Sequence, residues 1–135
     1  MNRIIMERKN LNHIEAVSPI LNVKSISASV DFYVNMLGFK NAEWGNENFT
    51  SVNRDHSGIY LCRNGQGQAG TYIWIGFDGD IFGLYEELQS KGVIIKMPPK
   101  NFSWAMEMHV LDPDGHVLRL GTDPDPVKPF LDMEE

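Results

Sequence analysis

The feature that most constrains the fold is an order of elements that occurs twice along the 135-residue chain. Residues 16–64 predict a strand, a helix and three more strands, and residues 71–122 predict the same order after the glycine-rich loop NGQGQAG. The spacing from Val23 to Gly38 equals that from Phe77 to Gly92, although the halves share few identical residues. The repeat therefore predicts two βαβββ modules.

Capping residues support both predicted helices. Ser25 or Ser27 can begin the first helix and Gly38 ends it, whereas Asp80 begins the second and Gly92 ends it. The first strand is expected in AVSPILNV, later strands in FKNAEW and VIIKM, and the last pair around the turn DPDG. SVNRDHSGIYLC can be laid on HVLDPDGHVLRL, which places Val52 on Val110 and Ile59 on Val117.

Each module buries one sheet face beneath its helix and leaves the other face open. Two such modules can arrange their curved sheets around a central cleft, where small ligands usually bind. We therefore predict a single α+β domain over residues 16–122, made of modules at about 16–64 and 71–122. Residues 1–15 are expected to form an N-terminal arm, and residues 123–135 an acidic, proline-rich tail that is either a surface strap or disordered.

Composition excludes several classes of protein. The net charge is −6, which argues against nucleic-acid binding because phosphate neutralisation needs a basic surface. No segment reaches the roughly 18 apolar residues of a membrane span. Cys62 is the single cysteine, so a disulfide within the chain is impossible and a reducing, cytoplasmic location is expected.

Two stretches together resemble the vicinal-oxygen-chelate superfamily, which includes glyoxalase I, extradiol dioxygenases and the bleomycin-resistance proteins. They are ILNVKSISASVDFYVNMLGFK and LDPDGHVLRL, and the resemblance covers about residues 17–122. It implies two βαβββ modules around a cleft. The enzymes of this family hold a divalent metal there, which chelates two neighbouring substrate oxygens.

The family's metal positions carry unsuitable residues in this chain. They fall on Ser18, Trp74 and Arg119, with a fourth near Leu61 or Cys62, and a guanidinium would repel a cation. His109 and His116 flank the DPDG turn, but no carboxylate recurs at a fitting strand position and His116 is expected at an exposed turn. We therefore predict no metal, no cofactor and no catalytic residue.

The loss of metal ligands makes the chain similar to the metal-free bleomycin-resistance branch, whose members sequester a bulky cationic drug. The resemblance implies a homodimer whose chains share their ligand grooves. WAMEMHVLDPDG resembles the groove segment of that branch. The predicted ligand-binding residues are Trp104, Trp74, Phe32, Glu107, His109 and Arg119.

The polar members of this set leave alternatives open. Glu107 and His109 lie on one strand face and could form a structural pair, contact a ligand or act as acid and base. Arg119 is expected to pair with Glu107, and the alternative is that it binds an anionic substrate.

The favoured function is non-catalytic binding of a small molecule, cationic or aromatic and bleomycin-like. The alternatives are an enzyme of the glyoxalase or dioxygenase type with a non-standard site, and an interaction module with a vestigial cleft.

Overall fold

The computed structural model describes residues 12–132, which fold as two modules of the same topology. The first contains β1 (Ile20–Val23), α2 (Ile26–Asp31), the π-helical segment η1 (Phe32–Met36), β2 (Lys40–Asn41), β3 (Phe49–Arg54) and β4 (Ser57–Arg63). The second contains β5 (Tyr72–Gly76), α3 (Ile81–Ser90), β6 (Ile94–Asn101), β7 (Met106–Leu111) and β8 (Val117–Thr122). The predicted α+β repeat is therefore confirmed.

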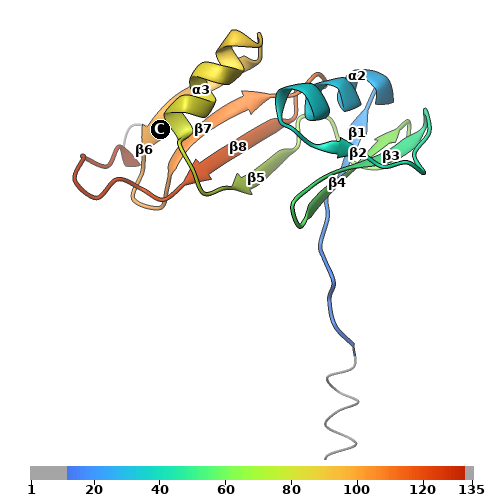
Figure 1. Ribbon diagram of the computed structural model, residues 1–135, viewed down its shortest axis with the longest axis horizontal. Helices are drawn as coiled ribbons and strands as arrows, with labels where there is room; N and C mark the ends of the chain where they lie inside the picture. The colour runs from blue at the N-terminus through green and yellow to red at the C-terminus, as the bar shows by residue number, and fades with distance from the viewer. Residues whose placement is uncertain (1–11, 133–135) are drawn as a thin grey trace, which may run out of the picture.

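Each module forms one mixed four-stranded sheet, in the order β1-β4-β3-β2 or β5-β8-β7-β6. The first strand of a module pairs in parallel with its last strand, and the remaining neighbours are antiparallel. The two sheets lie side by side, and α2 and α3 cover them from the same side (Figure 1). One apolar core beneath the helices includes residues of both modules. The sheet surface turned away from the helices is called the open face below.

The helix ends follow the predicted capping chemistry. The Ser25 hydroxyl and the Asp80 carboxylate each accept a backbone N–H of the first helical turn at 3.1 Å. Gly38 and Gly92 follow the helices with φ of 73° and 80°, a conformation that glycine adopts without steric cost.

Three strands differ in length from the predictions. β1 is confined to Ile20–Val23, after Pro19, and only Lys40–Asn41 of FKNAEW pairs as a strand. β6 was expected to end before Pro98–Pro99, but it continues through both prolines to Asn101. β6 lies at the edge of its sheet and its register with β7 shifts in this stretch, so the missing N–H groups interrupt few ladder bonds.

The predicted overlay of the two halves is wrong beyond the hairpin turn. Val52 pairs with Ile59, whereas Val110 pairs with Leu118 rather than Val117. Val52 and Ile59 are seven residues apart and Val110 and Leu118 are eight, so the second hairpin holds one more residue between paired positions and the corresponding positions of the last strands shift by one.

The extra length of the β7–β8 turn lets its acidic residues contact the first module. Asp112 accepts a hydrogen bond from the Tyr33 hydroxyl at 2.8 Å. Asp114 accepts the Lys24 backbone N–H at 2.9 Å and the Ser29 hydroxyl at 3.3 Å. Burial raises the pKa of Tyr33, and the charges of Asp112 and Asp114 and the hydrogen bond to Asp112 raise this pKa further.

His116 forms a second polar contact between the modules and is fully buried, contrary to the expected exposed turn position. Its Nδ1 accepts the Thr71 backbone N–H at 3.0 Å, and its Nε2 lies 2.7 Å from the Asn22 carbonyl oxygen. A neutral ring that accepts at Nδ1 donates from Nε2, so both nitrogens are satisfied.

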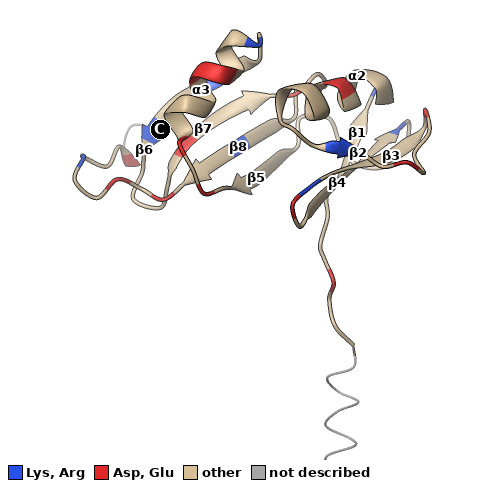
Figure 2. Cartoon of the chain, in the orientation of Figure 1, with Lys and Arg blue, Asp and Glu red and all other residues tan. Residues whose placement is uncertain are grey.

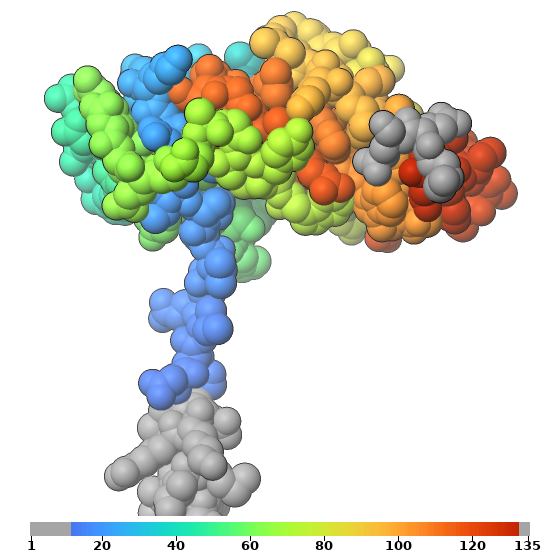
Figure 3. Space-filling view, turned by 180° about the vertical axis from the view of Figure 1, so that it is seen from behind, coloured from blue at the N-terminus to red at the C-terminus, as the bar shows by residue number. Residues whose placement is uncertain are grey.

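The described part of the C-terminal tail is a strap on the second module. The Asn101 amide donates to the carbonyl oxygens of Asp125, Lys128 and Pro129, and its Oδ1 accepts the Asp125 N–H. Figure 3 shows this segment, in red, packed against the end of the second module.

Charged residues are scattered over the molecule. Acidic residues occur in both helices, in several loops and along the C-terminal segment, and they do not gather on one face (Figure 2). Within residues 12–132, no helix has the length and apolar content needed to cross a bilayer.

Candidate functional site

Five of the six predicted ligand-binding residues gather at the open face of the second module. Alternate residues of β7 and β8 enter the core, which leaves Glu107, His109 and Arg119 on the opposite side of the sheet. Trp74 pairs with Arg119, which in turn pairs with His109, so these residues form one row across three strands. Trp104 precedes β7, and its indole reaches Glu107.

Glu107 is the centre of this cluster and is only 1% exposed. Arg119 donates from Nε to Oε2 and from Nη2 to Oε1, each at 2.9 Å. Trp104 donates from Nε1 to Oε1 at 2.5 Å, and His109 Nε2 lies 2.8 Å from Oε2. The predicted Glu107–Arg119 pair is therefore confirmed, and the ligand-contact roles of these residues stay predictions.

The surroundings keep Glu107 ionised. Burial alone would raise the pKa of its carboxyl group, but the hydrogen bonds from Arg119, Trp104 and His109 and the charge of Arg119 outweigh burial. The net effect holds the pKa of Glu107 below its ordinary value. A bidentate guanidinium pair of this kind is among the stronger charge-assisted contacts in proteins.

The same ion pair orients two large aromatic side chains. Trp104 donates to Glu107 and stacks on Phe102 with ring centroids 4.7 Å apart, while the Arg119 guanidinium lies 5.5 Å from the Trp74 ring. Trp74 and Trp104 nevertheless remain 50% and 47% exposed. The open face therefore presents two half-exposed indoles whose positions are fixed by their contacts with Glu107 and Arg119.

Gly121 makes room for one of these indoles. A Cβ atom added at Gly121 would come within 2.2 Å of Trp74 Cη2. Because glycine has no side chain, the six-membered ring of Trp74 can pack against the backbone of β8 at this position.

A hollow of about 310 Å³ adjoins Trp74 on the side of the first module. It brings Ser18, from the segment before β1, to the same cavity as Trp74, as their matched family positions imply. The remaining lining residues are Glu15, Ala16, Val17, Pro19, Phe39, His56, Ser57, Gly58, Ile59, Ile73, Ile75 and Gly76.

These residues do not fit the divalent metal that enzymes of this fold hold. Both oxygens of Glu107 already accept hydrogen bonds, and a cation beside them would meet the Arg119 guanidinium. Ser18 and Trp74 supply one hydroxyl and no strong ligand. In the described part of the chain, no three His, Cys, Asp or Glu side chains are grouped to hold a metal ion.

Phe32 was predicted to bind the ligand, but it does not lie with the other predicted residues. It is 8% exposed and belongs to the core, where its ring packs against Tyr33 in a T-shaped, edge-to-face arrangement. The chain continues from α2 into the π-helical turn η1 at this point, which directs both aromatic rings toward the sheet.

Sequence reasoning missed an aromatic cluster on the open face of the first module. Trp44, Phe49 and Tyr60 stack there, with neighbouring ring centroids 5.5–6.4 Å apart. Strand alternation carries the missing signal, because Phe49 and Tyr60 lie out of phase with the core residues Val52 and Ile59.

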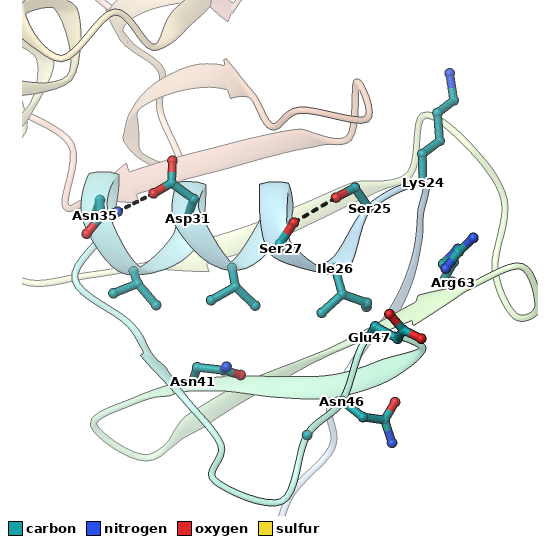
Figure 4. Close-up of a pocket in the computed structure, with 13 residues that line it drawn as sticks. Lys24, Ser25, Ile26, Ser27, Asp31, Asn35, Asn41, Asn46, Glu47 and Arg63 are labelled. Atoms are coloured by element: carbon teal, nitrogen blue, oxygen red, sulfur yellow. Dashed lines mark hydrogen bonds between the residues drawn. The ribbon is translucent and has the colours of Figure 1, made fainter.

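A larger hollow lies away from the open face, between α2 and the β2–β3 loop. It has a volume of about 800 Å³, with Ile26, Val30 and Val34 along its helical wall. Figure 4 shows Ile26 directed toward the loop, with Lys24 and Arg63 near one end and Asn35 and Asp31 near the other. The lining of this larger hollow contains none of the predicted site residues.

Comparison with models of protein families assigns the chain to one superfamily. The model of the "Glyoxalase/Bleomycin resistance protein/Dioxygenase superfamily" matches residues 10–120. None of the curated proteins matches the chain.

Solved structures share the fold. A protein from the mobile metagenome of V. pseudocholerae is 22% identical, with 85% of this chain and 99% of that chain covered and a TM-score of 0.71. TnmS3, an antibiotic binding protein from Streptomyces sp. CB03234, is 24% identical, with 85% and 98% covered and a TM-score of 0.70. A superfamily member from Sphaerobacter thermophilus is 25% identical, with 84% and 99% covered and a TM-score of 0.68.

Proposed function

Because the chain belongs to the glyoxalase/bleomycin resistance protein/dioxygenase superfamily, we propose that it binds a small planar aromatic molecule without turning it over. The binding surface is the open face of the second module. One observation carries the proposal: the Glu107–Arg119 pair contacts two half-exposed indoles, Trp74 and Trp104, on this face.

The two indoles suit a planar aromatic ligand. Trp74 starts from β5 and its ring lies beside Gly121 of β8, which pairs with Glu107, the acceptor of the Trp104 N–H. Indole faces attract aromatic rings and also cations, so a ligand with a cationic substituent would be accommodated. The neighbour TnmS3, an antibiotic binding protein, supports the binding of a small molecule by this fold.

The dimer expected for the metal-free branch would complete the surface. In that arrangement, the open face of one chain's first module covers the open face of its partner's second module. The exposed Trp44 and the stacked Phe49 and Tyr60 would then form an apolar wall opposite the Glu107 cluster. Sedimentation analysis of the full chain tests this part of the proposal, and a monomer at every concentration would contradict it.

Titration of the intrinsic tryptophan fluorescence with bleomycin tests the ligand class. We expect saturable quenching, and about tenfold weaker affinity for Trp74→Ala because a stacked indole contributes about 1 kcal/mol or more. Phe82→Ala is the matched control, since Phe82 is also about half exposed but lies on α3, on the helical side of the molecule. Equal affinity of Trp74→Ala and the parent chain would contradict the assigned surface.

A further inference from the structure

We propose that His109 selects the ligand by accepting a hydrogen bond at Nδ1, so that the ligand is a planar aromatic molecule carrying an O–H or N–H donor. The inference rests on the proposed function, because it concerns the surface between Trp74 and Trp104. It adds the chemical group that a ligand of this surface must present.

The hydrogen bonds of Glu107 fix the proton on His109. An ionised carboxylate only accepts, and it has about four acceptor sites. Arg119 donates twice and Trp104 once, and His109 Nε2 lies 2.8 Å from Oε2 as the fourth contact. Nε2 must therefore carry a proton, and in the neutral imidazole Nδ1 then holds a lone pair.

Nδ1 is both unpaired and accessible. Within residues 12–132 no group forms a hydrogen bond with it, and no buried side-chain nitrogen or oxygen in this range lacks a partner. Nδ1 must therefore touch solvent, although the side chain as a whole is only 15% exposed. The His109 ring is therefore mostly covered and offers a ligand one accessible acceptor, which favours one orientation of the ligand's donor group.

His109 supplies the acceptor that its neighbours lack. Indole and guanidinium groups donate only, and the acceptor sites of Glu107 are filled from within the protein. A ligand that lies over this face displaces the water at Nδ1. If it brings a donor, the hydrogen bond is replaced, and if it brings only carbon, the acceptor is left unsatisfied. Sites of this kind discriminate strongly against analogues that lack the donor.

Two probes of matched shape test the inference on the full chain. 2-Naphthol carries an O–H donor, and 2-methoxynaphthalene presents the same rings without a donor. We expect 2-naphthol to bind about tenfold more tightly at neutral pH, measured by calorimetry or by shifts of the tryptophan indole signals. His109→Phe is expected to bind both probes equally, and Phe82→Ala is expected to keep the preference.

A second variant keeps the test informative if His109→Phe does not fold. His109→Gln retains an amide N–H for Glu107 and a carbonyl oxygen for the ligand, so part of the preference for 2-naphthol is expected to remain. The imidazole nitrogens report the tautomer directly in a long-range ¹H–¹⁵N spectrum. We expect the neutral ring to carry its proton on Nε2 and to leave Nδ1 unprotonated.

The outcomes separate this inference from the proposed function. Equal binding of both probes by the parent chain would overturn the inference and leave the aromatic surface in place. Binding of neither probe would overturn both. A proton on Nδ1 in the unliganded protein would also overturn the inference, whatever the affinities.

Discussion

The two modules have the same topology, but the side chains on their open faces differ in kind. The strand pairing places Ile20, Tyr60 and Ser51 of the first module where the second has Trp74, Arg119 and His109. By the same register, Phe49 corresponds to Glu107. One face is therefore an aromatic stack and the other an ion pair between tryptophans.

The difference shows that the fold determines which strand positions face outward but does not determine which side chains occupy them. An aromatic stack gains energy from area and ring geometry and tolerates exposure. A buried carboxylate requires every one of its acceptor sites to be filled. The second module therefore depends on a few specific partners, and the first depends on general apolar character.

Removal of Glu107 should have the largest effect. Glu107→Ala leaves the Arg119 guanidinium and the Trp104 N–H without their acceptor, and we expect a loss of about 3 kcal/mol in the free energy of unfolding. Urea denaturation of the variant and of Phe49→Ala, its counterpart in the first module, measures the difference. The smaller loss should occur in Phe49→Ala, because its ring leaves no charge unpaired. A larger loss there would reverse the comparison.

Replacing both members of the ion pair tests whether their charges stabilise the chain only together. Glu107→Leu combined with Arg119→Met removes both charges together, so the double variant should be more stable than Glu107→Leu alone. Strictly additive losses would show that the two side chains are not energetically coupled.

Acidification should weaken the second module in particular. The pKa of Glu107 in the folded chain lies below its ordinary value of 4.5, so the folded state binds this proton less readily than the unfolded state. The contribution of Glu107 to stability is therefore full above pH 4.5 and is lost as the pH falls through the folded-state pKa. The unfolding free energy of the parent chain should fall more steeply than that of Glu107→Gln over this range. Parallel curves would contradict the assignment.

The two hairpin turns offer a third, smaller contrast. Asp114 accepts hydrogen bonds from Lys24 and Ser29 of the other module, whereas Asp55 lies in an exposed turn with one long contact to Arg54 at 3.8 Å. Asp114→Ala should lose about 1–2 kcal/mol, whereas Asp55→Asn, which keeps a residue that tolerates the φ of 54° at this position, should lose almost nothing. Thermal unfolding of both variants measures this, and equal losses would mean that the longer turn does not stabilise the joint between the modules.

The smallest effect is expected at Trp44. It is 60% exposed and stacks on Phe49 at 6.1 Å, so Trp44→Ala should cost less than about 1 kcal/mol in an isolated chain. A larger cost that depends on protein concentration would show that this face is buried against a second copy. Unfolding at several concentrations distinguishes the two.

The sequence predicted the elements well because caps and periodicity are local properties. Ser25, Gly38, Asp80 and Gly92 mark the helices correctly. The Glu107–Arg119 pair was also predictable, since both residues occupy outward positions on neighbouring strands.

The errors arise where tertiary context decides. Pro98–Pro99 lie within β6 because that strand is at a sheet edge, and no local pattern reveals which strand is at the edge. Phe32 enters the core because the helix widens into a π turn. One additional residue in the second hairpin hid the correspondence between Tyr60 and Arg119, and with it the aromatic face of the first module.

The indole N–H signals of the three tryptophans test most directly whether the second module's open face is the binding surface. In a ¹H–¹⁵N spectrum of the full chain, Trp74 and Trp104 report on that face and Trp44 on the first module. On titration with bleomycin we expect the Trp74 and Trp104 signals to shift together and to saturate at the same drug concentration. If both stay fixed at saturating drug, or if the drug moves the Trp44 signal alone, the second module is not the binding surface.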